Sequence, residues 1–180
     1  MTGRLIAVVG PSGVGKDSLI EALCAARPGL LRARRVITRP PAKSEPFDAV
    51  SEAEFERMRA TGRFALHWGA HDLHYGIPVE TLTEVREGGA VIANLSRGVL
   101  AEATRVYPAV TILSVTAPTE VLAVRLGARG REVGDEIARR LARPAPPPPP
   151  GARIVEVDNG GALEDAVAQA LAALSSEAAA

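Results

Sequence analysis

The sequence predicts an α/β fold with a mainly parallel central sheet in one domain. Short apolar runs alternate along the chain with segments in which apolar residues recur at helical spacing. This alternation is typical of parallel strands joined by helices, and such strands are buried on both faces. A length of 180 residues suits one domain with a sizeable core, and the chain has no internal repeat.

Local signals place the expected elements. Ser51 and Glu54 form a capping box in the sequence, so a helix should begin there, whereas the loop-like segment 39–48 contains three prolines. Pro78 near the first turn and Gly88 past the end mark another helix. Strands are expected at residues 5–9, 34–38, 90–94, 110–115 and 153–158. Helices are expected at residues 17–26, 51–59, 78–87 and 163–174, and after the strands at 90–94 and 110–115.

Composition and charge exclude several classes of protein. Lys+Arg and Asp+Glu are 21 each, so no global charge favours nucleic acid or a membrane surface. Cys24 is the single cysteine, which excludes an intrachain disulfide, and we expect a small buried side chain rather than a nucleophile. Neither a signal peptide nor a membrane-spanning segment is apparent, so a cytoplasmic location is expected.

The segment "GPSGVGKDS" is nearly a phosphate-binding loop, whose usual pattern is G-x-x-x-x-G-K-[ST]. It stands between an expected strand and an expected helix, as that motif requires. Backbone N–H groups and the helix N-terminus would form an anion nest, and Lys16 would reach the β- and γ-phosphates. A chance glycine-rich turn is the alternative. The residues expected to bind ATP are Gly10, Pro11, Ser12, Gly13, Val14, Gly15, Lys16, Asp17 and Ser18.

Asp17 stands where the loop normally carries the hydroxyl that binds Mg²⁺. A carboxylate is also a hard oxygen ligand, and a charged one. If Asp17 faces away from the metal, it is only a first-turn acid favoured by the helix dipole. We expect contact with Mg²⁺, directly or through water. Ser18 could still reach the phosphates, although helical geometry turns it about 100° from Asp17.

Five separated segments together resemble guanylate kinases over nearly the whole chain: "GPSGVGKDS", "VITRPP", "VSEAEFERMRATGRFALHW", "HYGIP" and "RLGARGREVGDEIARRLAR". The resemblance implies a P-loop nucleoside-monophosphate-kinase-like three-layer fold. It implies a core of residues 1–35, 88–124 and 151–180, an acceptor-binding module of residues 36–87 and an arginine-rich lid of residues 125–143. The proline-rich segment 144–150 should be an extended polyproline II connector, the alternative being a site for a proline-binding partner.

The departures from guanylate kinases concern guanine recognition. His67 replaces a glutamate that reads the guanine edge, Ala42 replaces the second arginine of "TR-x-P-R", and Phe47 replaces a tyrosine. The acidic "D-x-Q-G" segment becomes "NLSRG" at residues 94–98. Without these groups a guanine base would go unread, which should cost orders of magnitude in discrimination.

The chain is instead similar to ribose 1,5-bisphosphate phosphokinases of phosphonate utilisation, a subgroup close to guanylate kinases. That subgroup carries "GPSG-x-GKDS", "RVITRP", "FAL-x-W-x-AHGL-x-YG-x-P" and "RGRE…EI-x-x-RL-x-R". The chain matches these patterns at residues 10–18, 35–40, 64–78 and 129–143, except that Asp72 stands where the subgroup has glycine. The resemblance implies conversion of ribose 1,5-bisphosphate to 5-phosphoribosyl 1-diphosphate with ATP and Mg²⁺.

The same resemblance implies a role for each candidate residue. An anionic phosphate acceptor needs no general base, so catalysis should be positioning and charge neutralisation. The implied catalytic groups are Lys16, Arg129 and Arg140, with Asp158 and Asn159 at the adenine. The implied acceptor-binding residues are Arg35, Thr38, Arg39, Glu45, His67, His71, Tyr75 and Gly76. A guanylate or other nucleoside monophosphate kinase, or a non-catalytic guanylate-kinase-like binding module, is the alternative. The expected partners are small molecules, without nucleic acid or membrane, and the expected state is a monomer or homodimer.

Overall fold

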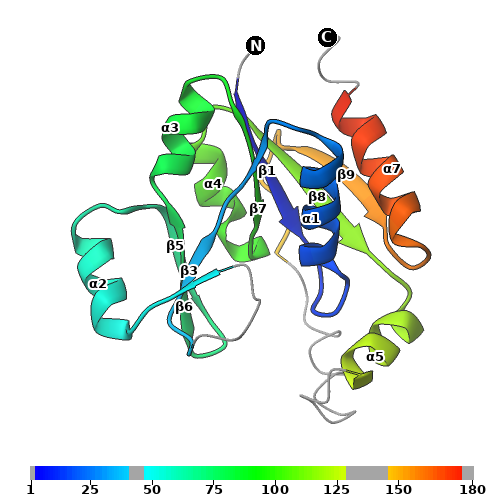
Figure 1. The fold of residues 1–180 in the computed structure, drawn as a ribbon, viewed down its shortest axis with the longest axis horizontal. Helices are drawn as coiled ribbons and strands as arrows, with labels where there is room; N and C mark the ends of the chain where they lie inside the picture. Colours follow the sequence, from blue (N-terminus) through cyan, green and yellow to red (C-terminus); the bar gives the residue numbers. More distant parts are fainter. Residues whose placement is uncertain (1–2, 41–46, 129–145, 176–180) are drawn as a thin grey trace.

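A five-stranded sheet runs through the centre of the protein in the order β2-β7-β1-β8-β9 (Figure 1). The computed structural model describes residues 3–40, 47–128 and 146–175. Every neighbouring pair of strands in this sheet is parallel, and the register places Val8 of β1 beside Asn94 of β7. The strands are β1 (Arg4–Val9), β2 (Leu30–Arg32), β7 (Ala90–Asn94), β8 (Val110–Thr116) and β9 (Arg153–Asp158).

Helices cover both faces of this sheet, which explains why its inner strands are almost continuously apolar (Figure 1). Ile6 and Val8 of β1 pack in the cluster that contains residues of α1 and α7. Leu5, Ala7 and Val9 point to the opposite face and pack with residues of α3 and α4. The helical segments are α1 (Lys16–Ala26), α3 (Glu80–Arg86), the short 3₁₀ helix η1 (Arg97–Val99), α4 (Leu100–Val106), α5 (Thr119–Ala128) and α7 (Leu163–Ser175).

A second sheet has the strand order β4-β3-β6-β5 and lies beside the first (Figure 1). Strands β3 and β4 pair in parallel, whereas β3 with β6 and β5 with β6 are antiparallel. Phe55 anchors α2 to this sheet, because its buried ring lies 4.7 Å from that of Phe64, centroid to centroid. The elements are β3 (Arg35–Ile37), β4 (Phe47–Ala49), α2 (Glu52–Ala60), β5 (Phe64–Ala70) and β6 (Leu73–Pro78).

The structure confirms the predicted α/β fold and its parallel central sheet. The strands expected at residues 5–9, 90–94, 110–115 and 153–158 are observed to within one residue at each end. Ser51 caps α2 as predicted, since its Oγ accepts a hydrogen bond from the backbone N–H of Glu54 at 3.2 Å. The reciprocal half of the capping box is absent, because the Glu54 carboxylate accepts two hydrogen bonds from Arg57 instead.

Three expectations about secondary structure differ from the structure. The segment 39–48 is not all loop, because Phe47 and Asp48 pair with β3 beyond the last proline of that segment. Pro78 ends β6 instead of lying in a helix: the N–H of Val79 still donates to the carbonyl of Arg63 at 3.0 Å, and α3 begins only at Glu80. Strand β2 and the β5–β6 hairpin are not among the predicted elements. Within the described ranges, no helix has the length and apolar character needed to cross a bilayer.

Candidate active site

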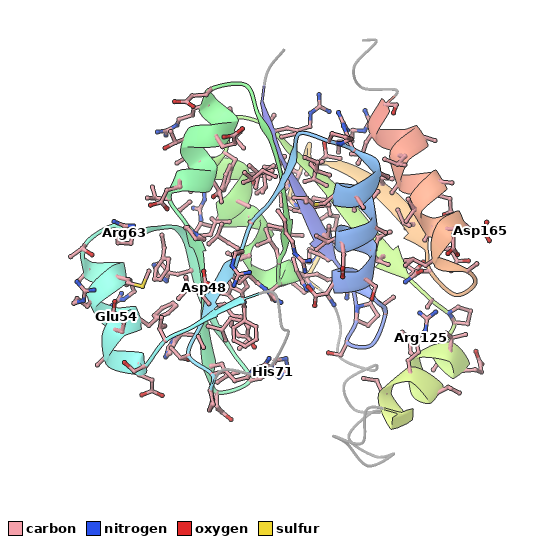
Figure 2. The ribbon with its side chains drawn as sticks, in the orientation of Figure 1. Asp48, Glu54, Arg63, His71, Arg125 and Asp165 are labelled. Atoms are coloured by element: carbon pink, nitrogen blue, oxygen red, sulfur yellow. The ribbon has the colours of Figure 1, made fainter. Side chains whose placement is uncertain are left out.

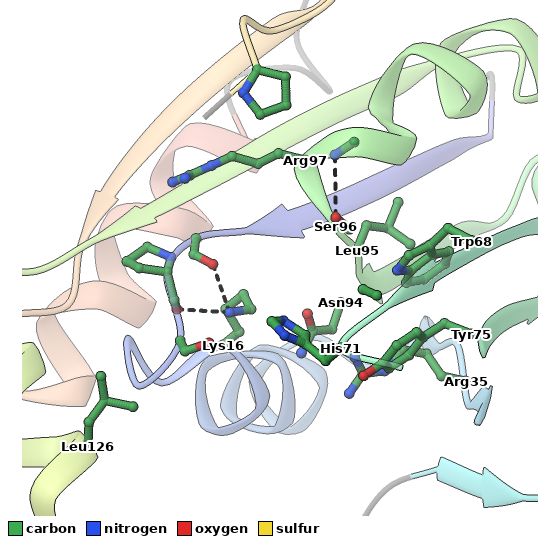
Figure 3. Close-up of a pocket in the computed structure, with 16 residues that line it drawn as sticks. Lys16, Arg35, Trp68, His71, Tyr75, Asn94, Leu95, Ser96, Arg97 and Leu126 are labelled. Carbon is green, nitrogen blue, oxygen red and sulfur yellow. Dashed lines mark hydrogen bonds between the residues drawn. The ribbon is translucent and has the colours of Figure 1, made fainter. Parts of the chain in front are cut away.

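The phosphate loop connects β1 to α1 and adopts a conformation that depends on its glycines. Gly13 and Gly15 have φ angles of 81° and 90°, a region that favours glycine. A Cβ on Gly15 would lie 2.6 Å from Nδ2 of Asn159, so a side chain there would displace that residue. Lys16 folds back across the loop, where its Nζ donates to the carbonyls of Gly10 and Pro11 at 2.9 and 3.0 Å (Figure 3).

A cavity of about 490 Å³ opens beside this loop, at the carboxyl ends of β1 and β7 (Figure 3). Open α/β sheets place ligands at this edge. Among the described residues, its wall carries the cations of Lys16, Arg35 and Arg97 and has no aspartate or glutamate. The remaining lining residues are Gly10, Pro11, Ser12, Trp68, Ala70, His71, Tyr75, Asn94, Leu95, Ser96, Gly98, Leu126 and Pro146. Such a wall suits a small polyanion.

Aromatic rings and Arg35 form one side of the cavity. Trp68 and Tyr75 stack with their centroids 5.4 Å apart and their planes 8° from parallel. The Arg35 guanidinium lies 6.0 Å from the Tyr75 ring centroid, and its side chain is only 17% exposed. Burial lowers the pKa of Arg35 from its ordinary value, and the nearby carboxylate of Asp17 opposes that shift. Because arginine stays charged in proteins, Arg35 presents a fixed positive charge to the cavity.

The described contacts of the Asp17 carboxylate are all made by one of its two oxygens. Its Oδ1 accepts a hydrogen bond from Nδ2 of Asn94 at 3.1 Å. The guanidinium groups of Arg32 and Arg35 approach the same oxygen, at 3.5 and 3.7 Å. These three partners come from β7, β2 and β3, so Asp17 connects the start of α1 to both sheets.

The turn of the β5–β6 hairpin carries His71 to the cavity (Figures 2 and 3). His71 and Asp72 have φ angles of 53° and 57°, the left-handed region that most side chains avoid. Two consecutive positive φ angles indicate a type I′ turn, which favours glycine and asparagine. The glycine expected at position 72 from the family pattern would therefore fit this backbone.

We expect the Asp72 turn to tolerate glycine and to reject a β-branched residue. Asp72→Gly should change the free energy of unfolding by less than about 0.5 kcal/mol, because relief of backbone strain offsets the greater entropy of the unfolded chain. Asp72→Val should lose about 1–2 kcal/mol, because its Cβ opposes a left-handed conformation. Urea unfolding of both variants checks this; equal stabilities would contradict the turn conformation.

Asn159 stabilises the phosphate loop through a side-chain hydrogen bond to the loop backbone. Its Nδ2 donates to the carbonyl of Val14 at 2.7 Å, and its backbone N–H donates to Thr116 at 2.8 Å. The side chain is 3% exposed, and its Oδ1 has no hydrogen-bond partner in the described part of the chain. Asp158 caps the turn after β9, where its Oδ1 accepts from the N–H of Gly160. Neither Asp158 nor Asn159 lines the cavity beside the loop.

The other predicted acceptor residues lie at different places in the protein and do not form one site. Thr38 and Arg39 border a separate cavity of about 380 Å³ near the start of α2. His67 is exposed on β5 and does not line the cavity beside the loop. Gly76 is buried, and a Cβ there would lie 2.5 Å from the Phe64 ring. Close packing against Phe64 therefore explains why this position carries glycine. Arg129, Arg140 and Glu45 lie outside the described residues.

Two further residues of the loop belong to its helix and core rather than to the cavity wall. Val14 is fully buried, and Ser18 is exposed on α1. Neither lines the cavity, so the part of the predicted loop that faces it is Gly10, Pro11, Ser12 and Lys16.

Arg97 and Asn94 are site residues that the sequence analysis did not identify. Both lie on the segment "NLSRG" that follows β7, and both line the cavity. Arg97 is half-buried, and its guanidinium makes no hydrogen bond or ion pair with the residues that the structure describes. In the sequence, this segment was noted only for lacking the acidic "D-x-Q-G" residues. It also carries a cation just after a buried strand, where open α/β sheets bind ligands, and that observation would have identified Arg97.

Comparison with known proteins places the chain in a family. No family model matches it. It is 52% identical over 178 residues to ribose 1,5-bisphosphate phosphokinase PhnN of Ruegeria sp. strain TM1040, covering 97% of this chain and 93% of that protein. It is 45% identical to the protein of the same name from Brucella melitensis biotype 2, covering 88% and 85%.

The fold is shared with a solved guanylate kinase. The crystal structure of guanylate kinase from Anaplasma phagocytophilum matches with a TM-score of 0.68 and 21% sequence identity, covering 98% of this chain and 86% of that one. At this identity the likeness concerns the fold alone. The closer sequence relationships decide the family: the chain belongs to the ribose 1,5-bisphosphate phosphokinases.

Proposed function

We propose that the protein transfers the γ-phosphoryl group of ATP to ribose 1,5-bisphosphate, giving ADP and 5-phosphoribosyl 1-diphosphate. The observation that carries the proposal is the cavity beside the phosphate loop, where the lining residues that the structure describes include three cationic side chains and no carboxylate. This arrangement suits an acceptor that bears two phosphates. The family of the chain supports the same reaction, since the relatives carry that name.

The proposed reaction needs charge neutralisation rather than a base. An oxygen of the 1-phosphate attacks the γ-phosphorus, and the bond from that phosphorus to the β–γ bridging oxygen breaks, leaving ADP. The attacking oxygen is already anionic, so no proton has to be removed. Lys16 would exchange its contacts with Gly10 and Pro11 for β- and γ-phosphate oxygens. Arg129 and Arg140 are proposed to clamp the transferred group from the lid.

Asp17 fits a role at Mg²⁺, and Asn159 fits one near the adenine. One oxygen of Asp17 holds the described contacts, and the other is left for a ligand. Asp17 would hold Mg²⁺ there, and the metal would neutralise negative charge on the phosphates. The buried Oδ1 of Asn159, which has no hydrogen-bond partner among the described residues, is an acceptor suited to an amino group, with Asp158 beside it. Their contacts with ATP remain part of the proposal.

The acceptor pocket is proposed to join the two cavities. Arg35, His71 and Tyr75 would bind the acceptor from the cavity beside the loop. Thr38 and Arg39 would act from the neighbouring cavity, where the Arg39 guanidinium lies 4.6 Å from the Phe47 ring centroid. Glu45, His67 and Gly76 are retained as acceptor residues from the family pattern, with Gly76 acting through packing.

Coupled ADP-release assays with ribose 1,5-bisphosphate and with GMP, run side by side, test the proposed function. We expect kcat/KM for ribose 1,5-bisphosphate to exceed that for GMP by at least about 10³-fold, because the groups that would read guanine are absent. Phosphorus NMR should show the diphosphate of the product. Turnover of GMP alone would contradict the proposal. Turnover of neither substrate would favour the non-catalytic binding module.

A further inference from the structure

Asp17 and Asn94 meet where α1 faces the end of β7. Asn94 is the last residue of β7 and lies beside Val8 of β1 in the sheet register. Asp17 is the second residue of α1. The amide of Asn94 donates to Oδ1 of Asp17 at 3.1 Å, and Asn94 is only 8% exposed, so its side chain is held in place.

P-loop enzymes hold Mg²⁺ with a hydroxyl on the residue after the loop lysine and a carboxylate on a strand. In this chain the residue after Lys16 carries the carboxylate, and the strand residue that contacts it carries a neutral amide. One carboxylate and one neutral hydrogen-bond partner are therefore both present, but in exchanged positions. Among the described residues, no group of three or more histidine, cysteine or acidic side chains offers another metal site.

The two oxygens of Asp17 are not equivalent. Oδ1 receives Asn94, Arg32 and Arg35, whereas Oδ2 makes no hydrogen bond with the residues that the structure describes. The contacts on Oδ1 fix the orientation of the carboxylate. A carboxylate held by one oxygen can offer the other to a hard cation.

We propose that Asp17 and Asn94 are the metal-binding carboxylate and its orienting partner, with their usual positions exchanged. Asp17 Oδ2 contacts the Mg²⁺ of the magnesium–nucleotide complex, directly or through water, and Asn94 orients Asp17. The inference rests on the proposed use of ATP and Mg²⁺.

The exchange has a physical consequence for the acceptor. Asn94 lines the cavity and Asp17 does not, so the exchange removes a fixed negative charge from the wall that faces the acceptor. An acceptor with two phosphates gains from that removal, because like charges at short range repel. Asn94→Asp alone should therefore raise the KM for ribose 1,5-bisphosphate about tenfold or more, an effect separate from the metal.

The test is equilibrium binding of a fluorescent ADP analogue, with excess Mg²⁺ and with EDTA. Four proteins are compared: wild type, Asp17→Asn, Asn94→Asp and the double variant that exchanges the two side chains. In wild type, Mg²⁺ should increase the affinity for the ADP analogue, and we call this increase the tightening by Mg²⁺. Asp17→Asn should reduce the tightening at least about tenfold and leave the affinity in EDTA nearly unchanged. The double variant should regain the tightening to within about threefold of wild type. Glu21→Gln, which removes an exposed carboxylate one turn further along α1, is the matched control and should behave like wild type.

Three results would overturn the inference. In the first, Asp17→Asn keeps the tightening by Mg²⁺. In the second, it weakens binding equally with and without Mg²⁺, which is the behaviour of a counter-ion to Arg32 and Arg35 alone. In the third, the folded double variant does not regain the tightening. Thermal unfolding verifies folding, and if the double variant does not fold, Asp17→Ser with Asn94→Asp takes its place under the same criterion. The assay contains no acceptor, so a wrong acceptor assignment leaves its outcome intact.

Discussion

Lys16→Met should lower kcat by about 10²–10³-fold while the protein stays folded. Lys16 is the cation of the phosphate loop, and its Nζ already lies among the loop carbonyls that surround the phosphate position. Charge develops on the γ-phosphoryl oxygens in the transition state, and losing one preorganised donor typically costs about 10²–10³-fold. Methionine keeps the length of the side chain and removes its charge, so packing should change little.

Steady-state ADP release and thermal unfolding together measure this prediction. Arg105→Met, on the exposed face of α4 and away from the cavity, removes one positive charge and serves as the control. It should retain activity within about twofold. If Lys16→Met raised only the KM for ATP, Lys16 would bind the ground state and transition state equally well, and the transition-state role would be wrong. Lys16→Arg should also be impaired, because the planar guanidinium is not interchangeable with an ammonium group.

The inner strands of the central sheet were predictable because they are buried on both faces. Continuous apolar runs such as residues 5–9 and 90–94 indicate buried strands when glycines and segments of helical periodicity flank them. The β5–β6 hairpin lacks such a signal. Its turn is formed by His71 and Asp72 instead of the Asn-Gly pair that usually marks a type I′ turn.

The phosphate loop was predictable for a different reason, since its residues are contiguous and its glycines have a local role. The partner of Asp17 was not, because Asn94 lies 77 residues further along the chain. Only the parallel pairing of β1 with β7 brings the two side chains together. Sequence alone left Asp17 with two possible orientations, and the structure shows its Oδ1 hydrogen-bonded to Asn94.

Arg97→Gln should lower kcat/KM for ribose 1,5-bisphosphate by about 10- to 100-fold. A hydrogen bond to a charged group contributes about 1.5–3 kcal/mol, which corresponds to that range. Arg97, Arg35 and Lys16 all line the cavity, and they come from three separate segments of the chain (Figure 3). Two separated cations match two separated phosphates on one ribose. The Arg97 guanidinium also has no competing partner in the described part of the chain, so binding a phosphate breaks no contact with those residues.

Ribose 5-phosphate, which lacks the 1-phosphate, can show which cation meets which phosphate. If Arg97 binds the reacting 1-phosphate and Arg35 the 5-phosphate, Arg97→Gln should leave inhibition by ribose 5-phosphate unchanged. Arg35→Gln should weaken that inhibition at least about tenfold. The opposite pattern would place the acceptor in the reverse orientation, with its 1-phosphate at Arg35, and would contradict the assignment of Arg97 to the reacting phosphate.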